Sequence, residues 1–101
     1  MVKIIHNEEE FSKETGGESA IVDFSATWCG PCQMLKPIIE KVAEEHPELN
    51  ILSLDVDEVP SPCEKLGVFS IPTVILFKDG KETKRNVGYL PEAGFKKFLG
   101  I

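Results

Sequence analysis

Two cysteines three residues apart are the part of this chain best suited to chemistry. They stand in the segment Trp28-Cys29-Gly30-Pro31-Cys32. At this spacing one sulfur can reach the other without movement of the fold, because residues i and i+3 share a helix face within disulfide reach. Such a pair can pass two electrons, and with them a disulfide, to a partner protein. The segment therefore predicts thiol–disulfide exchange.

The position of Cys29 predicts which sulfur attacks first. A short apolar run precedes it and a long helical pattern follows, so Cys29 is expected at the start of a helix and Cys32 one turn later. Unpaired backbone N–H groups and the positive end of the helix dipole favour a thiolate at that place. Because the thiolate is the attacking species, Cys29 is the expected nucleophile. Cys32 is expected to be less exposed and to act later.

The residues between the cysteines bear on the direction of electron transfer. Pro31 suits the first turn of a helix, where its missing N–H costs nothing. Gly30 and Pro31 offer neither a charge nor a side-chain donor to the Cys29 thiolate. A histidine in this place would stabilise the thiolate and make the disulfide a stronger oxidant. The Gly-Pro pair therefore favours a reductant.

Two structural roles for the cysteine pair are weaker alternatives. A zinc site needs two further ligands, and the remaining candidates, Cys63, His6 and His46, do not form a pair at the usual spacing. A purely structural disulfide across so short a loop would constrain the unfolded chain little.

Cys63 is expected to be a small buried hydrophobic residue, with a regulatory or intermolecular thiol as its alternative.

Length and composition favour one small globular domain, covering residues 1–101. The chain is 42% hydrophobic and 28% charged, and its 17 acidic and 11 basic residues give a net charge of −6. This acidic net charge argues against nucleic-acid binding, because domains that bind nucleic acid carry a basic surface patch. No run is long enough for a membrane span or a signal-peptide core. With only three cysteines, a reducing, cytoplasmic setting is the simplest expectation.

Hydrophobic periodicity predicts the element order βαβαβαββα. A parallel sheet covered by helices on both faces should therefore carry an antiparallel hairpin at one end, with Asp79-Gly80 as its two-residue turn. The charged pairs Lys84-Arg85 and Lys96-Lys97 are expected on solvated faces. The predicted strands cover residues 2–5, 20–24, 50–57, 73–77 and 82–87, and the predicted helices 8–14, 31–45, 60–66 and 91–99.

Beyond the cysteines, the sequence resembles the thioredoxin family over essentially its full length. A Cys-x-x-Cys motif alone is a loose signal, but with Trp before it and Ile-Pro-Thr later in the chain it is highly specific. The matching pieces are Val22-Asp23-Phe24, Trp28-Cys29-Gly30-Pro31-Cys32, Pro37, Asp55-Val56-Asp57, Ser70-Ile71-Pro72-Thr73, Phe77-Lys78-Asp79-Gly80 and Val87-Gly88.

The resemblance implies a fold, an activity and partners. The fold would be the α/β thioredoxin fold, a central five-stranded mixed sheet flanked by four helices. The activity would be that of a general protein-disulfide reductase, a monomeric electron carrier that serves cell redox homeostasis. Its substrates would be disulfide-containing proteins, and a thioredoxin reductase, linked to NADPH or to ferredoxin, would recycle it. No cofactor is implied, because the Cys29–Cys32 dithiol is itself the redox group. The alternatives are a disulfide oxidase or isomerase on the same fold, and a non-catalytic docking subunit.

The resemblance also assigns a role to a buried acid. Asp23 should lie in a buried strand, where a carboxyl group tends to have a raised pKa. In the family the matching Asp helps to move the proton of the second cysteine through water, and that role carries over to Asp23 and Cys32. The alternative is an Asp whose oxygens are satisfied by backbone groups at the strand end.

A surface for substrates follows from the same resemblance. Pro72 would be cis and would press the Ile71 backbone against the dithiol, where the Ile71 main chain could hydrogen-bond an extended substrate segment. We call the surrounding surface the apolar rim. Taken singly, Pro72 could be an ordinary strand-initiating proline, Trp28 could be core packing and Gly88 a bulge. The apolar rim consists of Trp28, Gly30, Pro31, Ile71, Pro72, Val87 and Gly88.

Two serines depart from the family pattern. Ser25 stands where many members carry a second Trp, which affects local packing rather than the chemistry. Ser53 stands where some members have a Lys near the buried Asp. Without that ammonium, Asp23 should be easier to protonate.

Overall fold

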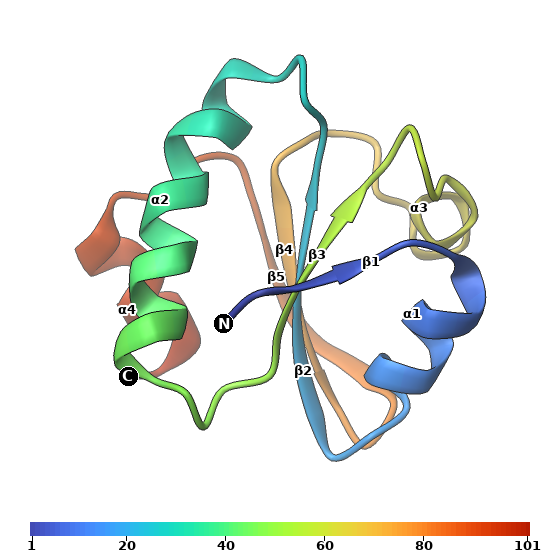
Figure 1. Cartoon of the computed structure of the whole chain (residues 1–101), viewed down its shortest axis with the longest axis horizontal. Coiled ribbons are helices and arrows are strands. Elements are labelled where there is room, and N and C mark those ends of the chain that lie inside the picture. Colours follow the sequence, from blue (N-terminus) through green and yellow to red (C-terminus); the bar gives the residue numbers. More distant parts are fainter.

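A mixed five-stranded sheet forms the centre of the molecule (Figure 1). The structure, a computed structural model, describes residues 1–101. The strands lie side by side in the order β1-β3-β2-β4-β5, where β1–β3 and β3–β2 pair in parallel and β4 runs antiparallel to both its neighbours. Their bounds are β1 (Lys3–Ile5), β2 (Ser19–Ser25), β3 (Ile51–Asp55), β4 (Thr73–Lys78) and β5 (Lys81–Val87).

Four helices cover the two faces of this sheet, as Figure 1 shows. Helices α1 (Glu8–Thr15) and α3 (Ser61–Leu66) lie on one face, and α2 (Gly30–Glu45) and α4 (Glu92–Leu99) on the other. The predicted element order and fold class are confirmed. None of the helices combines the length and the apolar character that a membrane crossing requires.

Alternation along β2 divides the interior into two cores. Successive side chains of a strand point to opposite faces, so Val22 and Phe24 enter the core beneath α1 and α3, while Ile21 enters the core beneath α2 and α4. Phe24 is fully buried, and its ring centroid lies 6.1 Å from that of Phe11. The same alternation turns Asp23 toward α2, the helix that begins at the cysteine pair.

Local signals set several of the element boundaries. The Asn7 side chain accepts the Glu10 N–H at 2.8 Å and so caps the start of α1. The β4–β5 turn has φ of 52° at Asp79 and 81° at Gly80, the left-handed pair that a tight two-residue hairpin needs. The hairpin prediction is confirmed.

Two predictions from the sequence were wrong in detail. The strand predicted over 50–57 ends at Asp55, because the Asp55 carboxylate accepts the Asp57 N–H at 2.8 Å and turns the chain. The Lys84-Arg85 pair is not simply solvated. Arg85 donates to the Leu66 carbonyl at 2.8 Å and pairs with Glu82 at 2.6 Å, so it fastens β5 to the end of α3.

Candidate active site

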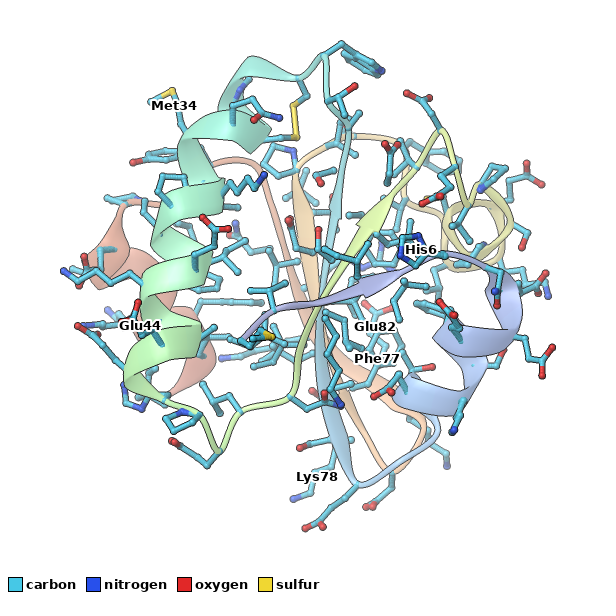
Figure 2. All side chains as sticks on the ribbon, viewed as in Figure 1. His6, Met34, Glu44, Phe77, Lys78 and Glu82 are labelled. Carbon is cyan, nitrogen blue, oxygen red and sulfur yellow. A yellow bond between two sulfur atoms is a disulfide. The ribbon has the colours of Figure 1, made fainter.

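The cysteine pair stands at the start of α2, where Figure 2 shows it as a disulfide. Cys29 is the residue that caps the helix, and its Sγ accepts the Cys32 N–H at 3.3 Å. The two Cα atoms are 5.3 Å apart, within the usual range for a disulfide. A sulfur that caps a helix faces unpaired N–H groups and the positive end of the dipole, which favours its thiolate form in the reduced protein.

The expected difference in exposure between the two sulfurs is absent from this disulfide form. Cys29 is 5% exposed and Cys32 4% exposed. Both pack with Ala26, and the partly buried Val56 and Ile71 pack against this cluster. Burial therefore does not distinguish one sulfur from the other, and the two differ in that Cys29 alone caps the helix.

The loop before α2 is held by a residue that the sequence analysis did not single out. The Gln33 amide donates to the Ala26 and Thr27 carbonyl oxygens at 3.4 Å each. Gly30 and Pro31 are exposed in the first turn, and no atom lies within 4 Å of a Cβ placed on Gly30. The first turn of α2 beside the cysteine pair is therefore open to solvent, although the two cysteines themselves are buried.

The Ile71–Pro72 segment lies directly against Cys29. The peptide bond between them is cis, and the Ile71 carbonyl oxygen is 3.8 Å from Cys29 Sγ. The Pro72 carbonyl accepts the Gly88 N–H at 2.7 Å, next to the paired residues Thr73 and Val87. Two parts of the apolar rim that are distant in sequence are thus joined beside the dithiol.

Trp28 lies on the surface and not in the core. It is 69% exposed, and its indole Nε1 donates to Asp57 Oδ2 at 2.7 Å. Asp57 fixes the orientation of the ring and was not among the predicted site residues, although it lies in a segment that carries the family resemblance. Val87, on the other flank, is 58% exposed. Met34 projects from α2 away from the sheet and adds another exposed apolar side chain (Figure 2).

Asp23 is buried beneath α2. It is 6% exposed, and its neighbours across the sheet are Ser53 on β3 and Val74 on β4. Its Oδ1 has no hydrogen-bond partner in the protein, so the alternative of a carboxyl group satisfied by backbone groups is wrong for this oxygen. Burial raises the pKa of Asp23 from its ordinary value of 3.8 to about 7.

A cavity lies between Asp23 and Cys32. Its volume is about 180 Å³, and Asp23, Cys32, Ser25 and Ser53 are among the residues that line it. A space of this size, lined by polar atoms, has room for the ordered water that would bridge a carboxyl group and a thiol. The two serines that depart from the family pattern thus contribute small hydroxyl groups to this cavity.

The other cysteine and the histidines lie apart from the site. Cys63 is buried in α3, across the sheet from α2, and burial raises the pKa of its thiol. His6 lies 3.4 Å from a carboxylate oxygen of Glu58, and His46 lies 3.2 Å from one of Glu48. No group of three or more His, Cys, Asp or Glu side chains is arranged to hold a metal ion.

Comparison with known proteins finds thioredoxins as the relatives of this chain. The family model Thioredoxin matches residues 2–100. The thioredoxin of Chlamydia muridarum is 51% identical over 99 residues, which cover 98% of this chain and 96% of that protein. The thioredoxin of Staphylococcus aureus is 42% identical over 100 residues, which cover 98% and 94%.

A solved structure shows the same fold over nearly the whole chain. The thioredoxin of Plasmodium falciparum superposes with a TM-score of 0.91 at 30% identity, and the match covers 97% of this chain and 96% of that one. The chain therefore belongs to the thioredoxin family.

Proposed function

We propose that this chain reduces disulfide bonds in other proteins, with Cys29 as nucleophile, Cys32 as resolving cysteine and Asp23 as the group that takes the Cys32 proton. Thioredoxin-family proteins are thiol–disulfide oxidoreductases. The observation that supports the assignment of roles is the helix cap, where Cys29 Sγ accepts the N–H of Cys32, which lies one turn further along α2.

The first step joins the two proteins. The reduced chain docks a partner on the apolar rim, and the Cys29 thiolate attacks one sulfur of the partner disulfide. The partner S–S bond breaks, a new S–S bond to Cys29 forms, and the other partner sulfur leaves as a thiolate. The Ile71 main chain beside Cys29 is placed to hydrogen-bond an extended partner segment.

The second step releases the partner. Cys32 loses its proton through water to Asp23, and the resulting thiolate attacks Cys29 Sγ. The mixed disulfide breaks, the second partner sulfur leaves and takes up a proton, and the Cys29–Cys32 disulfide remains. With a pKa of about 7, Asp23 is partly ionised at neutral pH and can both accept and release the proton.

The cycle closes with reduction of the disulfide. Proteins of this family are reduced by a thioredoxin reductase. We propose that this chain, a single domain over residues 1–101, works as a cytoplasmic monomer in electron transport from such a reductase to substrate proteins. The net charge of −6 favours protein partners over nucleic acid.

The reduction potential separates a reductase from an oxidase or isomerase. A Cys63→Ser variant leaves the Cys29–Cys32 pair as the only thiols and can be equilibrated with defined thiol buffers. We expect a potential more reducing than the cytosolic glutathione pool, about −240 mV by extraction. A value near those of oxidising compartments would contradict the proposed direction and favour an oxidase or isomerase.

A second variant tests the alternative of a docking subunit. Cys29→Ser removes the nucleophile but keeps the fold and the apolar rim. We expect it to lose protein-disulfide reduction, as measured with a protein substrate and dithiol regeneration. Full retention of the cellular function without the thiol would instead support a role in docking alone.

A further inference from the structure

Phe69 carries an aromatic ring that the fold leaves outside its interior. Its side chain is 91% exposed, more than that of any other large apolar residue except Met1. It belongs to none of the buried clusters, whereas the preceding Val68 is buried. The ring lies over the backbone at the end of α3, because a Cβ placed on Gly67 would be 3.7 Å from its nearest atom. Single exposed apolar side chains are ordinary, so the place of this one decides what it can do.

Phe69 stands close to the reacting sulfur. It precedes by two residues Ile71, whose carbonyl oxygen is 3.8 Å from Cys29 Sγ. Two residues span at most about 7 Å of chain. The connection from α3 to β4 crosses the end of the sheet where α2 begins (Figure 1). A partner sulfur must touch Cys29 Sγ to be attacked, so the partner residues beside its cysteine come within reach of the Phe69 ring.

The backbone that carries Phe69 is fastened on both sides. Before it, the Val68 N–H donates to the Cys63 carbonyl at 2.9 Å. After it, the Thr73 hydroxyl donates to the Ser70 carbonyl at 2.6 Å. A backbone that is already fixed loses little conformational entropy when a partner binds. The ring is therefore a preformed contact rather than part of a loose loop.

The surroundings of Phe69 favour an apolar contact over a charged one. Residues 66–77 contain no charged side chain. Arg85, which donates to the Leu66 carbonyl at 2.8 Å, is already paired with Glu82 at 2.6 Å. A charged partner side chain would find no free counter-charge on this segment. An apolar one would cover the ring and remove its surface from water.

We propose that Phe69 is a specificity-determining residue, which selects partner disulfides by packing against an apolar side chain of the partner beside the attacked cysteine. This inference rests on the proposed function, because it needs Cys29 as the attacking sulfur. The spacing of Phe69 and Ile71 places the contact about two to three residues from the partner cysteine. A partner with polar residues there is attacked in the same way but docks more weakly. The chain therefore prefers disulfides that lie in apolar segments.

Two synthetic peptides measure this preference. Each carries one cysteine as a mixed disulfide with 5-thio-2-nitrobenzoate, and the second and third positions on either side are Leu in one peptide and Ser in the other. When the Cys29 thiolate attacks the peptide sulfur, the peptide becomes bound to Cys29 and the coloured thiolate leaves, which absorbance records. Rates with dithiothreitol correct for the intrinsic reactivity of each peptide.

The second-order rate constant of the wild type should be about ten-fold higher for the Leu peptide than for the Ser peptide. In Phe69→Ser the rate with the Leu peptide should fall about five-fold, as expected for loss of an aromatic docking contact. The rate of this variant with the Ser peptide should stay within about two-fold of the wild type. Phe69→Leu keeps an apolar side chain and should retain most of the preference.

Ile101→Ser is the matched control, because it removes an exposed apolar side chain far from the dithiol. The Ile101 N–H donates to the Lys96 carbonyl, and Lys96 pairs with Glu45 at the last residue of α2. This variant should keep the wild-type preference. Urea midpoints of the Phe69 variants should match that of the wild type, since the ring contributes to no buried cluster.

An NMR titration of the oxidised protein gives a second readout, which needs no turnover. The probe is the Leu peptide with Ser in place of its cysteine. We expect chemical-shift changes at Phe69 and Ile71, and a dissociation constant about five-fold weaker for Phe69→Ser. The same titration of Ile101→Ser should match that of the wild type.

The two readouts separate failure of this inference from failure of the proposed function. Equal preference for the Leu peptide in wild type and Phe69→Ser would overturn the role of Phe69 and leave the reductase intact. If the wild type reduces no protein disulfide but binds the Leu peptide at Phe69, the proposed function fails while the docking contact stands. An equal loss in Ile101→Ser would overturn the inference. So would a wild-type dimer that Phe69→Ser converts to a monomer, because a second copy would then cover the ring.

Discussion

Replacing Asp23 by Asn should make the protein more stable, and increasingly so as the pH rises. The pKa of Asp23 is about 7 in the folded chain against 3.8 in an ordinary setting. Between these values the folded state holds a proton that the unfolded chain has released, so ionisation favours unfolding. The free energy of unfolding of the wild type should therefore fall as the pH rises through this window and level off above about pH 7.

The size of this effect follows from the gap between the two pKa values. About three pKa units at about 1.4 kcal/mol each give about 4 kcal/mol. Because Asn keeps the shape and never ionises, the stability difference between Asp23→Asn and wild type should grow by about 4 kcal/mol between about pH 3 and pH 8. Somewhat more than a third of that growth should be complete at about pH 5, and half of it at about pH 5.4.

Urea unfolding of the oxidised proteins at a series of pH values measures this difference. The oxidised form is the right one, because the disulfide removes the titration of Cys29 and Cys32. Glu40→Gln is the matched control, since it neutralises an exposed acid on α2 and should change stability by less than about 0.5 kcal/mol at every pH. A stability difference for Asp23→Asn that stays constant with pH would refute the reasoning, because it would place Asp23 in contact with bulk water.

Three further substitutions test other parts of the structure. Phe24→Ala removes a fully buried ring and should lower the free energy of unfolding by about 3–5 kcal/mol, and a loss below about 1 kcal/mol would contradict the packing described. Arg85→Met should cost about 1–3 kcal/mol in urea unfolding, because it leaves the Leu66 carbonyl without its donor; an unchanged midpoint would show that this contact contributes nothing. Trp28→Ala should lower kcat/KM for protein disulfides by about ten-fold while the rate with a small aromatic disulfide stays within about two-fold, and equal losses for both would place Trp28 in the chemistry rather than in docking.

The parts of the fold that could be predicted from the sequence depend on neighbours along the chain. Asp79-Gly80 specifies its hairpin because the two residues themselves supply the left-handed backbone. Asn7 caps α1 through a contact three residues away. The cysteine pair could be interpreted for the same reason, since one helical turn contains both sulfurs.

Contacts between distant segments could not be predicted in this way. Arg85 looked like half of a solvated basic pair, because nothing near it in sequence indicates the carbonyl groups of α3. Asp57 holds the Trp28 indole only because the chain turns at the end of β3. The exposed position of Trp28 itself required the structure, since a lone Trp is equally at home in a core.

The meeting of the Cys29 segment with the Ile71 segment has a consequence for the unfolded chain. The two cysteines are neighbours in sequence, so a denatured copy keeps a dithiol that can still exchange with any disulfide it meets. The strip of backbone beside Cys29 exists only after β4 has been placed in the sheet. The capacity to exchange disulfides therefore belongs to a few consecutive residues, whereas the choice among partners belongs to the assembled topology and is lost when β4 leaves the sheet.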